Sequence, residues 1–164
     1  MGWTMTLRLE ADSLRTMKIP LVVLKIIEED KRLRGHKQNL DLIFSELLSN
    51  ALDWGVLRLD SSLKKNEEGF DKYFALRQEG LNALSEGWIM VDLEYAPLDV
   101  GGKLTLRVED SGPGFDYRNL DAFYDNAVYG GRGIHRVRAL CEEFAYYGNG
   151  SRVNAVYGWE ADVE

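Results

Sequence analysis

The chain has 164 residues, of which 45% are hydrophobic and 29% charged, so its composition predicts a globular domain and excludes a disordered chain. Its net charge of −7 argues against nucleic acid as the main partner, because no dense basic run is present to displace counterions. No apolar run approaches the roughly 20 residues that a membrane-spanning helix needs, so no membrane segment is expected.

The first half of the chain predicts one strand and two helices. Residues 4–10 alternate between apolar and polar side chains, which is typical of a strand. Pro20 can open a helix that continues to about residue 33, with Gly35 near its end. A second helix is predicted over residues 39–54, closed by Gly55.

The second half predicts a helix, a hairpin, another helix and two final strands. Residues 59–86 form an insert, with a loop that leads into a helix from about 67 to 85. Strands at 88–97 and 103–110 are separated by a short turn, which favours an antiparallel hairpin. A glycine-rich stretch then leads to a helix from about 133 to 143 and to strands at about 144–148 and 152–161.

These elements predict a single domain over residues 1–164. Its expected fold is α+β, a two-layer sandwich in which a mixed, mostly antiparallel sheet packs on one layer of helices. The single cysteine, Cys141, excludes an internal disulfide and lies among apolar residues at helical spacing, so a small core residue is the favoured interpretation. Its isolation fits a cytoplasmic protein.

The helix at 39–54 carries a polar stripe as well as an apolar one. At about 100° per residue, Glu46, Asn50 and Asp53 fall within roughly 60° of each other. By itself this stripe indicates a solvated helix face. Two later motifs change that interpretation.

The second motif is VEDSGPGFD, residues 108–116. Asp110 ends a predicted buried strand, and Gly112 and Gly114 follow it, which places a fixed carboxylate beside backbone that a ligand can approach. An ordinary polar turn is the alternative for this motif alone.

The third motif, YGGRGIHRV, places Gly131, Arg132 and Gly133 at the start of a helix. Unpaired N–H groups and the positive end of the helix dipole suit a phosphate there, and Arg132 adds a cation. A flexible entry loop is the alternative for this motif alone.

In this order, E-x-x-x-N-A, D-x-G-x-G and G-x-G resemble the nucleotide-binding signature of the GHKL ATPase superfamily, whose ATP-binding domain has the Bergerat fold. The resemblance covers residues 40–160 and implies ATP and Mg²⁺ as ligands. It implies that Asp110 binds the adenine amino group, with Gly112 and Gly114 letting the base approach, and that Asn50 ligates the magnesium ion. Gly131, Arg132 and Gly133 would then hold the phosphates, and residues 116–132 would form a lid.

The resemblance also implies roles for the two remaining polar residues of the helix, Glu46 and Asp53. Glu46 is similar to the general base of this superfamily, one helical turn before the proposed magnesium ligand. Asp53, a turn further on, is expected at the rim of the pocket.

Within the superfamily, a strand and a helix before the Glu46 motif resemble the anti-sigma-factor serine/threonine kinases. These bacterial proteins phosphorylate an antagonist protein, and some also bind a sigma factor. A non-catalytic, nucleotide-dependent protein-binding switch is the alternative. A histidine kinase domain is disfavoured, because neither His36 nor His135 lies on a long dimerising helix. Free-standing members often dimerise, and the sequence leaves a homodimer open.

Two departures from those kinases stand out. Trp54-Gly55 replaces their common His-Gly pair, and the insert at about 59–86 is longer than theirs. It resembles the form found at the C-terminus of response regulators that also contain a serine phosphatase domain, so the chain is a candidate fragment of a larger signalling protein. Within the insert, Tyr73, Phe74 and Arg77 are candidates for partner contact, although burial of the two aromatics against the domain is favoured.

Overall fold

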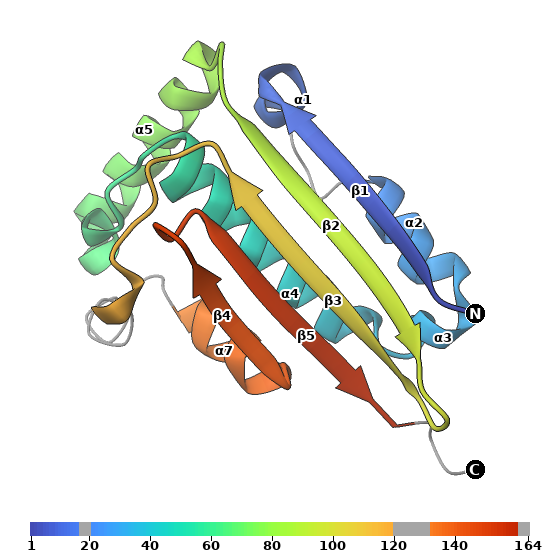
Figure 1. The fold of residues 1–164 in the computed structure, drawn as a ribbon. Helices are drawn as coiled ribbons and strands as arrows, with labels where there is room; N and C mark the ends of the chain where they lie inside the picture. Colours follow the sequence, from blue (N-terminus) through green and yellow to red (C-terminus); the bar gives the residue numbers. More distant parts are fainter. Residues whose placement is uncertain (17–20, 120–131, 161–164) are drawn as a thin grey trace.

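The structure, a computed structural model, describes residues 1–16, 21–119 and 132–160, with the backbone alone at Leu21 and Arg132. Figure 1 shows its elements along the chain. The strands are β1 Trp3–Glu10, β2 Trp88–Pro97, β3 Gly102–Asp110, β4 Glu143–Tyr147 and β5 Arg152–Trp159. The α-helices are α1 Ala11–Arg15, α2 Leu21–Glu29, α3 Lys31–Arg34, α4 Lys37–Asn50, α5 Glu67–Ala83 and α7 Arg132–Leu140. Shorter helical turns are η1 Ala51–Val56, η2 Ser61–Lys65 and η3 Tyr117–Asn119.

The five strands form one sheet in the order β1-β2-β3-β5-β4, and each neighbouring pair is antiparallel. The α+β class and the β2–β3 hairpin are therefore confirmed. The expectation of a partly mixed sheet is wrong for the described strands. Because β5 lies between β3 and β4, these two strands, which run in the same direction, do not pair with each other.

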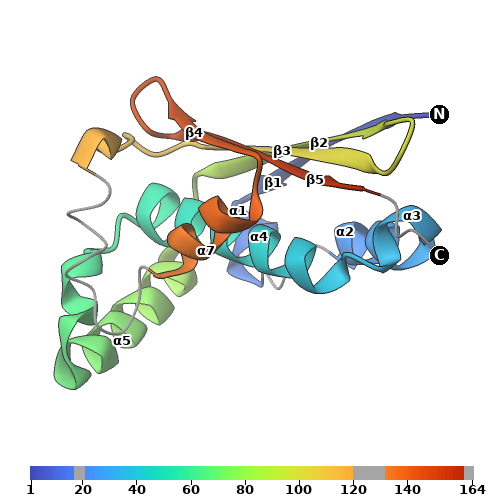
Figure 2. The same cartoon turned by 90° about the horizontal axis from the view of Figure 1, so that it is seen from below.

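Helices cover one face of this sheet and leave the other open (Figure 2). The inward side chains are buried apolar residues at alternate positions, such as Ile89, Val91 and Leu93 on β2. They pack on the apolar stripe of α4, which runs along the middle of the covered face. This stripe is the predicted one: Leu40, Ile43, Phe44, Leu47, Leu48 and Ala51 are all buried.

Three local features differ from the sequence prediction. The short helix α1 was not expected, and it forms directly after β1 because Ala11 and Leu14 are buried there. The predicted helix over 20–33 is interrupted at Asp30, whose carboxylate accepts the Arg32 N–H and so begins α3.

The third difference lies at the end of α4. From Ala51 the backbone widens into a π-helix, in which the N–H of Leu57 donates to the carbonyl of Leu52 at 2.8 Å. Gly55, predicted to close the helix, lies inside this turn. None of the described helices is long and apolar enough to cross a membrane.

The insert helix α5 is attached to η1 by a buried carboxylate. The Tyr73 hydroxyl donates to Asp53 Oδ2 at 3.0 Å, and Arg77 Nε donates to Asp53 Oδ1 at 2.8 Å. Tyr73 is buried as expected, whereas Phe74 is 55% exposed, so only one of the two aromatics buries the helix. Asp53 therefore fixes the insert to the domain.

We predict that Asp53→Ala lowers the free energy of unfolding by about 2–4 kcal/mol, because it leaves the Tyr73 hydroxyl and the Arg77 guanidinium without their acceptor. Urea denaturation followed by circular dichroism measures the change. Asp71→Ala, on an exposed part of α5, is the matched control and is expected to cost less than about 0.5 kcal/mol. Equal costs for the two variants would contradict the anchoring role.

Candidate functional site

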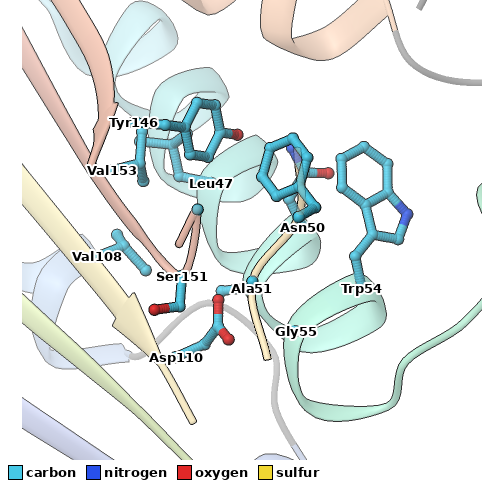
Figure 3. Close-up of a pocket in the computed structure, with 13 residues that line it drawn as sticks. Leu47, Asn50, Ala51, Trp54, Gly55, Val108, Asp110, Tyr146, Ser151 and Val153 are labelled. Carbon is cyan, nitrogen blue, oxygen red and sulfur yellow. The ribbon is translucent and has the colours of Figure 1, made fainter. Parts of the chain in front are cut away.

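A cavity lies where the end of α4 and the turn η1 meet the ends of β3 and β5 (Figure 3). Its empty volume is about 430 Å³, and this value includes the open space at its mouth. Asp110 and Ser151 lie on one side, and Asn50 and Trp54 on the other. The full lining consists of Leu47, Asn50, Ala51, Trp54, Gly55, Val108, Asp110, Gly114, Phe115, Tyr146, Gly150, Ser151 and Val153. Two of the predicted polar residues, Asn50 and Asp110, therefore meet in one largely apolar cavity, which is the usual composition of a small-molecule site.

Asp110 is the last residue of β3 and faces the helical layer. Its Oδ1 accepts the Gly112 N–H at 2.8 Å, while no described residue donates to Oδ2. The pKa of this carboxyl is raised to about 6: burial is the main cause, the Gly112 N–H opposes the rise, and the nearby charge of Glu109 adds a smaller contribution to it. One carboxylate oxygen is thus held in place and the other is available to a donor from a ligand.

Gly55 makes this position of the carboxylate possible. A Cβ atom at residue 55 would overlap the carboxyl group of Asp110. The sequence analysis treated Gly55 only as a helix end. No spacing signal indicated this contact, because at about 100° per residue Gly55 falls on the side of the helix opposite Glu46.

Asn50 reaches the cavity from the last turn of α4. Its Nδ2 is buried and has no hydrogen-bond partner among the residues that the structure describes. A buried amide without a partner is costly in a folded protein, unless a ligand or water satisfies it. The assignment of the amide oxygen and nitrogen can be exchanged, so either atom can face a ligand.

Glu46 lies one turn before Asn50 and does not line the cavity. Its carboxylate packs against the backbone of Gly133, at the first turn of α7, where a Cβ atom would overlap it. Burial raises the pKa of Glu46, and the positive charges of Arg136 and Lys64 partly offset this. The absence of a side chain at Gly133 therefore lets Glu46 approach the start of the helix.

The glycines that follow Asp110 serve the packing of loops. A Cβ atom at Gly112 would overlap the carbonyl of Gly55, and Gly114 has a φ of +78° beside the Asn149 carbonyl. Gly114 lines the cavity, but Gly112 does not. These contacts give both glycines a structural reason that the sequence analysis did not foresee.

The remaining predicted residues separate into two groups. Asp53 does not line the cavity, so its expected place at the pocket rim is wrong. The π-helix turns through less than 100° per residue, which carries Asp53 away from Asn50 and toward Tyr73 and Arg77. Gly131, the side chain of Arg132 and most of the expected lid at 116–132 lie outside the described residues.

Sequence reasoning missed Phe115 and Tyr146, two of the three aromatic residues of the lining. Trp54, Phe115 and Tyr146 line the cavity. The rings of Phe115 and Tyr146 pack edge to face, with their centres 4.9 Å apart. These residues come from three separate segments. Only the sheet order, which places β5 beside β3 and β4 beside β5, brings them together.

The donor set suits a metal that is bound mainly through a ligand. Within the described ranges, no three His, Cys, Asp or Glu side chains lie close enough to hold a metal ion by themselves. Mg²⁺ keeps several waters and takes one or two protein oxygens together with substrate phosphates. The amide of Asn50 fits such a role.

The comparisons with known proteins identify no relative. No protein-family model matches the chain. A search of curated proteins likewise gave no match. The functional argument therefore rests on the cavity and its residues.

We predict that the stability of the protein carries a pH dependence that Asp110→Asn removes. The pKa of this carboxyl is raised from 3.8 to about 6, so the folded state binds its proton more tightly than the unfolded chain. The free energy of unfolding should then fall as pH rises from about 4 to about 6 and stay level above that range.

Asp110→Asn keeps an acceptor for the Gly112 N–H and removes the buried charge. Relative to wild type, the variant should gain about 1–2 kcal/mol between pH 4.5 and pH 7.5. Urea denaturation at the two pH values measures this gain. A difference that does not change with pH would contradict the raised pKa of Asp110.

Proposed function

We propose that the domain binds ATP with Mg²⁺ and transfers the terminal phosphate to a serine or threonine of a partner protein. In the arrangement that the sequence resembles, this partner is an antagonist in a bacterial sigma-factor circuit, and the fold is the Bergerat fold. The observation that carries the proposal is the meeting of Asp110 and Asn50 in one apolar cavity, although they lie on a strand and a helix 60 residues apart in the chain.

The Asp110 end of the cavity supports recognition of adenine. Oδ2 of Asp110 can accept the amino group of the base, while the Gly112 N–H keeps the carboxylate oriented through Oδ1. Apolar side chains such as Val108, Val153 and Leu47 can pack on the flat base. A base that carries a carbonyl oxygen in place of the amino group would face the carboxylate with another acceptor.

Asn50 would hold the magnesium ion through its amide oxygen. When bound, the ion neutralises charge on the phosphates and fixes their orientation. The amide supports this role with its oxygen and nitrogen exchanged, because the oxygen then takes the buried place where Nδ2 has no partner among the described residues.

Glu46 has the properties that a general base needs. Burial raises its pKa, which makes the carboxylate a stronger proton acceptor. It lies one helical turn from Asn50 and touches the start of α7, where free N–H groups favour phosphate. We assign to Glu46 the removal of the proton from the acceptor hydroxyl.

Calorimetric titration with ATP and ADP, with and without Mg²⁺, tests the binding site. Wild type should bind both nucleotides, Asp110→Ala should lose at least tenfold in affinity for either, and Asn50→Ala should lose the effect of Mg²⁺. No binding by folded wild type would overturn the proposal.

The transfer step is tested separately, with Glu46→Gln and radiolabelled ATP, using the antagonist-type protein of the same organism as acceptor. The variant should bind ATP but transfer no phosphate. Binding without transfer by wild type would instead favour the non-catalytic switch.

A further inference from the structure

Lys64 belongs to the insert and is half-buried, which is unusual for an ammonium group. It lies in η2, the short turn that begins when Asp60 accepts the Ser62 N–H. Its Nζ lies 4.2 Å from the centre of the Tyr73 ring, on α5. This cation–π contact holds the amine against the part of α5 that is bound to the domain.

Two carboxylates act on Lys64 without pairing with it. Burial lowers the pKa of Lys64, the negative charges of Asp53 and Glu46 oppose this, and the charge of Arg77 adds to it. Asp53 already accepts hydrogen bonds from Tyr73 and Arg77, as described above. No described residue forms a hydrogen bond or salt bridge with the amine of Lys64, so its three N–H donors have no protein acceptor in this part of the structure.

The order of the site residues along the axis of α4 and η1 indicates which end of a nucleotide Lys64 would meet. Asp110 touches Gly55, whereas Glu46 lies nine residues earlier in the chain, roughly 13 Å along a helix axis. With the base at Asp110 and the metal ligand at Asn50, the terminal phosphate falls toward Glu46. Glu46 is also one of the two carboxylates whose charge acts on Lys64, and Asp53 is the other.

We infer that Lys64 binds the terminal phosphate of the nucleotide, so that the insert distinguishes ATP from ADP; this inference rests on the proposed ATP site. An ammonium on a flexible stem is a common phosphate ligand, because it acts as a compact positive charge. A phosphate beside Lys64 would bring further negative charge and hydrogen-bond acceptors. These would offset the free-energy cost of burying the ammonium group.

The neighbouring residue provides a control within the same turn. Lys65 is exposed and forms no cation–π contact among the described residues, although it has the same charge and is one position away. A general loss of positive charge would affect ATP binding equally in Lys64 and Lys65 variants. A specific phosphate contact would affect only the Lys64 variant.

Calorimetric titration of wild type, Lys64→Met and Lys65→Met with Mg²⁺-ATP and Mg²⁺-ADP tests the inference. Methionine keeps an apolar stem against Tyr73 and removes the charge. Lys64→Met should weaken ATP binding at least tenfold and ADP binding less than threefold, and Lys65→Met should change neither by more than about twofold. Lys64→Arg should keep the preference for ATP, which excludes loss of folding as the cause.

The outcomes separate the two proposals. Binding of neither nucleotide by wild type would overturn the ATP site, and the role of Lys64 with it. Normal binding by wild type with an unchanged ATP preference in Lys64→Met would overturn only the role of Lys64. An equal loss of ATP and ADP binding in that variant would also contradict a contact with the terminal phosphate.

Discussion

The close approach of the Asp110 carboxylate to the backbone of Gly55 is the contact on which the candidate site depends. It joins the end of β3 to the π-helical turn η1, and a side chain at residue 55 would occupy the place of the carboxylate. Gly112 then packs on the carbonyl of Gly55 and donates its N–H to Asp110. The same contact buries the carboxyl group, which raises its pKa and leaves one oxygen for a ligand. The contact between Asp110 and Gly55 therefore determines both how η1 packs on the end of β3 and the environment of the carboxylate.

The π-helix has a second consequence, because it separates the three polar residues of the stripe. Asn50 lies at the cavity and Glu46 at the start of α7, while Asp53 turns to the insert. Through Asp53, Tyr73 and Arg77, the insert is attached directly beside the cavity. This attachment holds Lys64 against the Tyr73 ring, where the charge of Glu46 acts on it.

Periodicity alone predicted β1, β2, β3 and the buried stripe of α4, because alternate and helical spacing report directly on which side chains are buried. The prediction that Asn50 and Asp110 belong to one site came instead from the resemblance that the ordered motifs carry. The π-helix could not be predicted this way, since its hydrogen-bond pattern follows from packing between Gly55 and the loop after β3. The partner of Asp53 lies 20 residues away on another helix, and the aromatic lining depends on the strand order.

The most direct test of an adenine site is an NMR titration of ¹⁵N-labelled protein with Mg²⁺-ATP and, separately, with Mg²⁺-GTP. The Gly55 and Gly112 amides flank the Asp110 carboxylate and report on the base. The account predicts large, saturable shifts of both signals with ATP and none with GTP, because guanine places a carbonyl oxygen where adenine has its amino group. Equal shifts with the two nucleotides, or unchanged Gly55 and Gly112 signals at saturating ATP, would contradict it.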